Sequence, residues 1–326
     1  MTGDSARKVT VVITGANSAV GLAILRCAPS LSTSIRFIAA VRSDRAIEEI
    51  RRSTGITDGL VRISYDVPDS LDAAFHGAVA VIHLPGVLIE RTGSTYEQVH
   101  IGTTRSVVGA ARRIGVAKLV FVSAVGADER STNRYWRTKG EAEREVRLSG
   151  LSYTVLRAPL LLGPGTEGSA ALQRHAARGR ATLIGGGRQI HQPLDVEDLA
   201  RAAVAASRPG IADGCTLDIV GLVSLTEREL VERVARLQGS PIRIRSVPKR
   251  LVSALLTVRG LTRQRGFSPD ALDVITADTR ADPRLAPTAL GIELTGLDDL
   301  IRKSLGQRGP MALAKDDEHA TNTGVD

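Results

Sequence analysis

The chain has 326 residues, of which 43% are hydrophobic and 24% are charged. A chain of this size can bury a large core and form one extended domain or two unequal ones. It contains no run of about 18 uncharged apolar residues, and residues 1–8 are polar. The sequence therefore predicts neither a membrane-spanning helix nor a signal peptide, and we expect a cytoplasmic protein.

The charge balance is basic, because 43 Lys and Arg residues against 35 Asp and Glu residues give a net charge of +8. Such a balance suits a nucleic acid partner or an anionic surface. However, the arginines recur beside acidic residues, and aromatic residues, which stack on single-stranded bases, make up only 3%. We therefore expect no nucleic acid partner. A cofactor with several negative charges is the simpler explanation for local basic residues.

Cysteines and histidines give no sign of a metal site. Cys27 and Cys215 lie far apart, in helix-like and strand-like segments. Neither has the spacing of metal ligands, so we expect reduced structural thiols. His175 and His191 likewise lack metal-ligand spacing with a pair of carboxylates. The sequence predicts no metal ion.

Short apolar runs rich in Val and Ile alternate with amphipathic stretches through the first half of the chain. This alternation is typical of a parallel sheet covered by helices on both faces. The expected strands are residues 9–13, 34–40, 60–64, 79–84, 118–123 and 152–157. The expected helices, spaced as right-handed crossovers require, are residues 19–27, 44–52, 70–76, 94–113 and 133–149. We predict an α/β fold, a Rossmann-type doubly wound parallel sheet.

The pattern changes after Arg157, where the Leu- and Gly-rich segment 160–165 ends the alternation. The later elements that we expect are helices over 167–178, 194–207 and 226–238 and a strand over 215–220. We predict a Rossmann domain and a smaller C-terminal substrate lobe.

The predicted domain boundaries follow from this change. The Rossmann domain covers residues 1–163 and is rejoined by 186–221. The smaller lobe covers 164–185 and 222–307. Residues 308–326 are too poor in apolar side chains to pack, so the sequence predicts a disordered tail.

The first expected strand runs directly into the small-residue turn Thr14-Gly15-Ala16-Asn17-Ser18-Ala19-Val20-Gly21. A helix start presents free N–H groups and a positive dipole end, so such a turn can bind a pyrophosphate. Glycine would allow the close approach of backbone and ligand, although a plain tight turn remains the alternative. The cofactor-binding candidates are Gly15, Asn17, Ser18, Ala19, Val20 and Gly21.

The end of the second expected strand indicates which dinucleotide would bind. An NAD-specific fold places an acidic residue there, whereas this chain has Arg42, with Arg45 nearby. A guanidinium suits the 2′-phosphate of NADP, so we expect NADP(H) before NAD(H), with solvated surface arginines as the alternative. Asp66 could accept a hydrogen bond from adenine or cap a helix. The other cofactor-binding candidates after the third and fourth strands are Val67, Leu84, Pro85 and Gly86.

Tyr135 and Lys139 are four residues apart in the expected helix at 133–149, so they share one helix face. A cation beside a phenol favours the phenolate and brings its pKa from about 10 toward neutral, which suits a general acid or base. Because this spacing also arises by chance, the catalytic interpretation of the pair depends on the segments around it.

Seven segments between residue 9 and about residue 200 carry a resemblance to a known family. They include TGANSAVG, AAVRSDR, YWRTKGEAE and QPLDVEDLA, in that order. The chain resembles an atypical or extended short-chain dehydrogenase/reductase, and it is most similar to NAD(P)H-binding proteins related to the accessory subunit of respiratory complex I and to NmrA-like proteins. The resemblance implies that Tyr135 exchanges a proton with the substrate, Lys139 holds the nicotinamide ribose and Ser123 orients the substrate.

The chain departs from the family pattern in its turn and in its fifth strand. Ser18 stands where the family has a glycine, and it narrows the space for a ligand close to the backbone. The family's catalytic hydroxyl falls on Ala124, one place after Ser123. His100 stands where many relatives have an Asn that helps to position the lysine, although a lone histidine on a helix is more often structural.

These observations favour an NADP-dependent oxidoreductase that transfers a hydride between nicotinamide and a small carbonyl or alcohol substrate, with Tyr135 as general acid or base. The alternatives are a non-catalytic NAD(P)H-binding redox sensor or assembly scaffold, and a nucleotide-sugar epimerase or dehydratase. We expect the substrate between the carboxyl edge of the sheet and the lobe, over residues 160–165. A homodimer through the helices at 94–113 and 133–149 is compatible with the sequence but not required by it.

Overall fold

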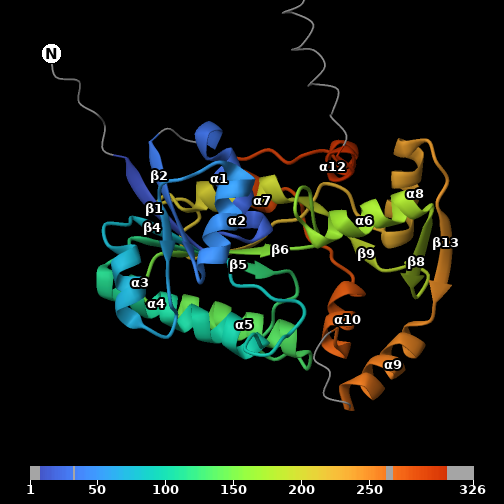
Figure 1. Cartoon of the computed structure of the whole chain (residues 1–326), viewed down its shortest axis with the longest axis horizontal. Coiled ribbons are helices and arrows are strands. Elements are labelled where there is room, and N and C mark those ends of the chain that lie inside the picture. The colour runs from blue at the N-terminus through green and yellow to red at the C-terminus, as the bar shows by residue number, and fades with distance from the viewer. Residues whose placement is uncertain (1–7, 32–33, 262–266, 307–326) are drawn as a thin grey trace, which may run out of the picture.

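The computed structural model describes residues 8–31, 34–261 and 267–306. Its centre is a seven-stranded parallel sheet (Figure 1). The strands are, in sheet order, β11 Cys215–Asp218, β6 Tyr153–Ala158, β5 Lys118–Ala124, β4 Ala80–His83, β1 Val9–Thr14, β2 Ile35–Val41 and β3 Leu60–Arg62. This is the order of a doubly wound Rossmann sheet with one added strand, so the predicted fold class is confirmed. The predicted disordered tail lies outside the described residues.

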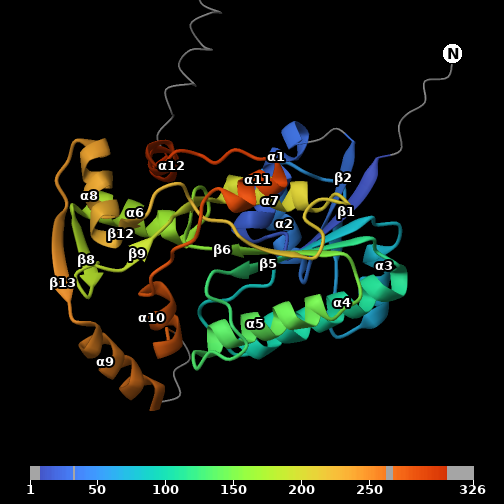
Figure 2. The same cartoon turned by 180° about the vertical axis from the view of Figure 1, so that it is seen from behind.

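Helices cover both faces of the sheet, as Figures 1 and 2 show. One face is packed by α1 Ala19–Leu31, α2 Asp44–Thr54, α7 Val196–Ala206 and α11 Leu285–Leu290, and the other by α3 Pro68–Phe75, α4 Thr103–Ile114 and α5 Arg134–Arg147. Successive side chains of β1 alternate between these layers, with Val11 and Ile13 in one core and Val12 in the other. The strands are apolar on both sides because both sides are covered.

Three predicted elements differ from the structure. The helix expected over 194–207 begins only at Val196, because Leu194 and Asp195 form a short strand that pairs with residues 161–162. β3 ends at Arg62 instead of residue 64, because the Ser64 N–H donates to the Ser70 hydroxyl of α3 at 2.9 Å. The helix predicted over 94–113 begins with a π-helical turn, η1 (Glu97–Gly102), and continues as α4. Wide turns of this kind are rare and are frequent at functional sites.

After β6 the chain leaves the sheet and builds a smaller group of elements at one end of it. The strand predicted at 215–220 is β11, which pairs in parallel with β6. The remaining elements are β7 Leu161–Leu162, α6 Glu167–Arg178, β8 Arg180–Ile184, β9 Ile190–His191, β10 Leu194–Asp195, β12 Leu225–Thr226, α8 Glu227–Gln238, β13 Arg243–Val247, α9 Lys249–Leu261, α10 Pro269–Ile275 and α12 Leu297–Ser304. The role of this group as a substrate lobe stays a prediction. Within the described ranges, no helix has the length and apolar character needed to cross a membrane.

Gly140 in α5 lies directly against the loop that follows β5. A Cβ atom at this position would stand 2.2 Å from the backbone nitrogen of Glu129 and 2.4 Å from the carbonyl carbon of Asp128. The loop is also held by a bond from the Asp128 N–H to the Trp136 carbonyl oxygen at 3.2 Å. The absence of a side chain at Gly140 therefore allows the loop to rest on the helix.

We expect Gly140→Ala to lower the free energy of unfolding by about 2 kcal/mol or more, because the clash with backbone outweighs the gain in helix propensity. Gly109→Ala in α4 is the matched control, since the nearest atom to its Cβ would be the flexible end of Arg113 at 3.3 Å. That variant should gain about 0.5–1 kcal/mol. Urea denaturation measures both variants, and equal effects would contradict the close contact at Gly140.

Candidate functional site

The order of the sheet reverses between β4 and β1, because the chain builds outward from β1 in one direction and from β4 in the other. In open parallel sheets ligands bind at such a switch point, outside the carboxyl ends of the strands. β1 ends at Thr14 and β4 at His83, and these two residues lie side by side in the register. Gly15 and Leu84, which follow them, therefore lie on the two sides of the switch point.

The turn from β1 into α1 needs glycine at both ends. Gly15 has a φ of +73°, and a Cβ there would stand 2.8 Å from the Leu84 carbonyl oxygen. A Cβ at Gly21 would stand 2.4 Å from the Ala16 carbonyl oxygen. The first turn of α1, whose N–H groups have no intrahelical acceptor, consequently begins at the carboxyl edge of the sheet.

Ser18 acts as a cap for α1. Its hydroxyl accepts a hydrogen bond from the Gly21 N–H at 3.2 Å, and its own N–H donates to the Gly15 carbonyl oxygen at 3.0 Å. Among the other turn candidates, Asn17 is exposed and Val20 is buried. The departure from glycine at Ser18 therefore has a local structural reason, since the hydroxyl stabilises the helix start.

The remaining dinucleotide candidates reach the same edge of the sheet. Arg42 follows β2, and Asp66 and Val67 follow β3; all three are exposed. Gly86, after β4, is exposed as well, and a Cβ there would meet no atom within 4 Å. The structure thus brings the predicted cofactor residues to one edge, and their binding role stays a prediction.

Lys139 is almost entirely buried, with 3% of its surface exposed. Its ammonium donates to the carbonyl oxygens of Pro85, after β4, at 2.6 Å and of Val122, in β5, at 3.3 Å. Burial lowers the pKa of this ammonium from its ordinary 10.5 to about 8, and the Glu143 carboxylate opposes the shift. A positive charge is therefore held between the ends of β4 and β5 by neutral acceptors.

Tyr135 belongs to a cluster of three rings. It packs edge-on against Tyr96 and His100, with 5.6 and 5.3 Å between ring centres, and those two rings stack on each other. Burial, reinforced by Tyr96, raises the pKa of the Tyr135 phenol. The sequence argument expected the charge of Lys139 to lower this pKa. That expectation is wrong for the chain alone, because the loss of hydration dominates.

Ser123 lies near the carboxyl end of β5 and is 4% exposed. Within the described part of the chain its hydroxyl has no hydrogen-bond partner. A buried polar group without a partner costs about 1–3 kcal/mol, which a polar ligand could offset. Ala124, the last residue of β5, offers no hydroxyl. Ser123 is therefore the hydroxyl that β5 supplies beside Lys139.

His83 forms a buried link that the sequence analysis missed. Its ring nitrogens lie 2.6 Å from the Thr14 hydroxyl and 3.2 Å from the Thr104 hydroxyl, so it joins β1, β4 and α4. Burial and then the charge of Lys139 lower the pKa of His83 to about 3, and its ring is neutral. The sequence did contain a signal for this link: the apolar strands β1 and β4 each end in a polar residue, Thr14 and His83.

His100, in η1, ties that turn to α5. Its Nδ1 lies 2.9 Å from the Thr138 hydroxyl, and its Nε2 accepts from the Val87 N–H at 3.5 Å. Burial and the charge of Lys139 lower the pKa of His100 well below its usual value. Because both nitrogens have partners and the ring stacks on Tyr96, the geometry supports the structural interpretation of this residue.

α10 reaches the start of α5, next to Tyr135. The Arg134 N–H donates to the Asp270 carboxylate at 3.1 Å, and the Asn133 side-chain amide donates to the Asp270 carbonyl oxygen at 3.0 Å. Asn133 itself caps α5 by accepting from the Tyr135 N–H at 3.0 Å. The C-terminal part of the chain is therefore anchored beside the candidate acid or base, a contact that no sequence motif indicated.

The residues at this edge fit a dinucleotide. The start of α1 suits a pyrophosphate and Arg42 suits a further phosphate. The partnerless Ser123 hydroxyl and the Lys139 ammonium provide polar groups by β4 and β5. In the described ranges no group of three or more His, Cys, Asp or Glu residues could hold a metal ion. The sheet order and this edge define a dinucleotide-binding protein of the Rossmann type.

Comparison with known proteins gives the family. The model of an NAD(P)H-binding family matches residues 15–206, which is more than half of the chain, and the chain therefore belongs to that family. The resemblance to extended short-chain dehydrogenases/reductases is confirmed.

Curated relatives include reductases and a respiratory subunit. A ceramide reductase of Caulobacter vibrioides is 29% identical over 56% of this chain and 57% of its own. Subunit 9 of the mitochondrial NADH dehydrogenase (ubiquinone) 1 alpha subcomplex of Arabidopsis thaliana is 28% identical over 65% and 56%. A 2-alkyl-3-oxoalkanoate reductase of Stenotrophomonas maltophilia is 28% identical over 56% and 64%. The chain thus spans somewhat more than half the length of these relatives.

Solved structures share the fold at low sequence identity. A UDP-glucuronic acid 4-epimerase from Bacillus cereus, solved with UDP-glucuronic acid and NAD, has a TM-score of 0.71 and 17% identity, and covers 91% of this chain and 98% of its own. An NADPH-dependent quinone oxidoreductase from Escherichia coli, solved with NADPH, has a TM-score of 0.67 and 20% identity, and covers 89% and 98%. These similarities show the fold alone.

We expect the burial of Lys139 to have a pH signature in stability. In the unfolded chain its pKa is 10.5 and in the folded chain about 8, so between these values the unfolded state binds more protons and stability rises with pH. The stability of the wild type relative to Lys139→Met should increase by about 3 kcal/mol from neutral pH to pH 10.5. Urea denaturation of both proteins across this range measures the difference, and a flat difference would rule out the lowered pKa.

Proposed function

We propose that this protein is an NADP(H)-dependent reductase of the short-chain dehydrogenase/reductase type that acts on a small carbonyl or alcohol substrate. The observation that carries the proposal is the buried Lys139 ammonium, on the same helix as Tyr135. It bonds to the carbonyl oxygen of Val122, and the hydroxyl of the next residue, Ser123, has no partner among the described residues. Reductases among the relatives support the reaction class. The exposed Arg42 after β2 supports the preference for NADP.

Each residue has a distinct role in this proposal. NADPH, when bound, supplies the hydride. Lys139 binds the cofactor's ribose through its ammonium. Tyr135 gives its phenolic proton to the carbonyl oxygen during reduction and takes it back during oxidation. Ser123 donates a hydrogen bond that orients the carbonyl.

A second candidate function is a non-catalytic NAD(P)H-binding protein. The raised pKa of Tyr135 favours it, since a phenol that keeps its proton in a ring cluster is a weak acid and donates that proton poorly to a carbonyl. The match to a subunit of NADH dehydrogenase supports it as well. An epimerase or dehydratase acting on a nucleotide sugar remains a third candidate, supported by the fold of solved epimerases.

We expect Arg42→Ala to weaken NADPH binding about tenfold or more, because a charge-assisted bond to the 2′-phosphate is lost. Binding of NADH should change little. Calorimetric titration of the purified protein with each nucleotide measures the effect. Arg36→Ala is the matched control, because Arg36 is exposed near the opposite end of the same strand. Equal weakening of both nucleotides would show that Arg42 does not select NADP.

We expect Tyr135→Phe to lower turnover about a hundredfold or more while the affinity for NADPH stays within about twofold, because only proton transfer is lost. NADPH oxidation with a panel of aldehydes, ketones and quinones measures turnover. Tyr153→Phe, in β6, controls for the loss of a tyrosine hydroxyl elsewhere. If the wild type binds NADPH but oxidises it with none of these substrates, the non-catalytic candidate replaces the reductase.

A further inference from the structure

α9 presents an apolar face to solvent. Leu251 and Leu255 are 65% and 60% exposed, and their spacing of four residues puts them on the same side of the helix. In Figures 1 and 2, α9 lies at the far end of the smaller group of elements, away from the sheet. Exposed leucines scattered singly are ordinary, but a pair on one helix face is a surface that can take a partner.

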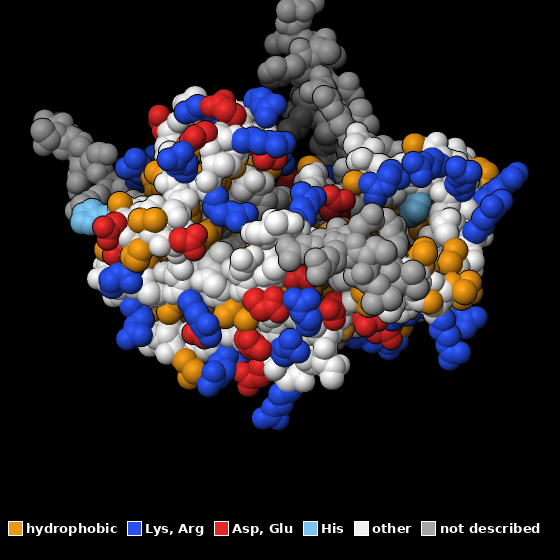
Figure 3. Space-filling model, turned by 60° about the horizontal axis from the view of Figure 1, so that its bottom comes forward, with side chains coloured by type: hydrophobic (Ala, Val, Ile, Leu, Met, Phe, Trp, Pro, Cys, Tyr) orange, Lys and Arg blue, Asp and Glu red, His pale blue; other side chains and the backbone are white. Residues whose placement is uncertain are grey.

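Basic side chains precede this face along the chain. Lys249 and Arg250 open α9, and exposed Arg243 and Arg245 lie on the strand before it. Carboxylates lie nearby as well. Asp273 pairs with Lys249 at 2.9 Å, and Asp278 accepts from the Ile190 N–H. The cations still outnumber the carboxylates. In Figure 3 hydrophobic side chains gather at the right-hand end of the molecule, with Lys and Arg side chains beside them.

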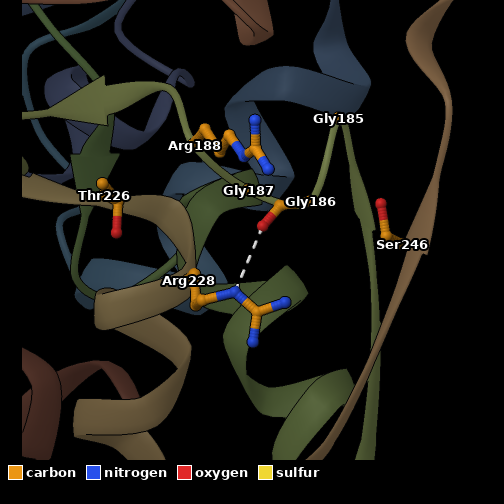
Figure 4. A pocket seen from close by; sticks show the side chains of 7 residues that line it. All are labelled: Gly185, Gly186, Gly187, Arg188, Thr226, Arg228 and Ser246. Atoms are coloured by element: carbon orange, nitrogen blue, oxygen red, sulfur yellow. Dashed lines mark hydrogen bonds between the residues drawn. The ribbon is translucent and has the colours of Figure 1, made fainter.

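A basic pocket adjoins the start of α9. Three consecutive glycines, Gly185 to Gly187, all with positive φ, form its floor, and Arg188 and Arg228 lie on either side of the turn (Figure 4). The cavity has a volume of about 340 Å³. The Arg228 Nε donates to the Gly186 carbonyl oxygen at 3.3 Å, and the Arg228 Nη1 lies 3.6 Å from the Glu232 carboxylate. A neighbouring cavity of 290 Å³ shares Gly185 and Arg188 and extends to Lys249. Guanidinium groups around a small cavity suit a phosphate group.

We propose that the α9 face and the adjoining pocket form a docking surface for a membrane that contains anionic phospholipids. Leu251 and Leu255 enter the boundary between headgroups and acyl chains, while Arg188, Arg228 and Lys249 stay at the level of the lipid phosphates. This is the arrangement of helices that lie in a membrane interface, where apolar insertion and attraction to anionic lipid act together.

The charge of the surface favours a lipid layer over a second copy of the chain. In a symmetric dimer through this face each copy would set its own arginines against those of its partner, and like charges at an interface are costly. An anionic lipid layer provides both interactions, because its phosphates neutralise the arginines and its acyl chains bury the leucines. The net charge of +8 attracts the whole chain to such a layer. This inference concerns binding alone and does not depend on the proposed reaction.

The test uses the full chain and sedimentation with vesicles of phosphatidylcholine, with and without phosphatidylglycerol. We expect binding to the anionic vesicles that weakens with salt, and little binding to the neutral ones. The double variant Leu251→Asp with Leu255→Asp should reduce the partition coefficient about tenfold or more. The matched control is Leu148→Asp, because Leu148 is 68% exposed at the end of α5 and should bind as the wild type does.

A second variant tests the pocket without changing α9. Arg188→Gln with Arg228→Gln should lower binding to anionic vesicles and leave NADPH titration unchanged, which shows that the variant is folded. Wild-type protein that does not bind anionic vesicles overturns the proposal, and so does binding that both double variants retain. A dimer in solution that dissociates in the Leu251→Asp, Leu255→Asp variant would assign the face to a second copy and also overturn it.

Discussion

The buried ammonium of Lys139 determines both the packing of α5 and the electrostatics at the carboxyl edge of the sheet. It is held by carbonyl groups from the ends of β4 and β5, so α5 cannot shift without leaving a charge in the interior without acceptors. Its charge also acts on the neighbouring imidazoles, because both His83 and His100 have pKa values lowered by burial and then by Lys139. One turn further along α5, the fully buried Glu143 supplies the opposing negative charge and is itself bound by Arg157 through two bonds.

The sheet and its helices were predictable because their signal is local. Apolar runs such as residues 11–13 are buried on both faces of the sheet, and consecutive residues of the sequence show this directly. The errors come from contacts between elements. β3 is short because Ser64 bonds to a hydroxyl of the following helix, and η1 widens where His100 must reach Thr138 in α5. Periodicity along one segment carries no information about such partners.

The positions of the candidate site residues were more predictable than their electrostatics. The turn at Gly15, Arg42 after β2 and the Tyr135–Lys139 pair all reach the edge that the motifs indicated. The direction of the Tyr135 pKa was wrong, because burial by Tyr96 and His100 depends on packing across elements. The anchoring of α10 on Asn133 joins residues more than a hundred positions apart, and no motif spans that separation.

The return of β11 to the sheet has a consequence during synthesis of the chain. β6 is complete at Ala158, but its outer edge has no partner until Asp218 has been made. During that interval the outer edge of β6 offers unpaired N–H and C=O groups, and such an edge is a template on which chains aggregate. A nascent chain therefore passes through a stage in which this edge is open to pairing with other chains.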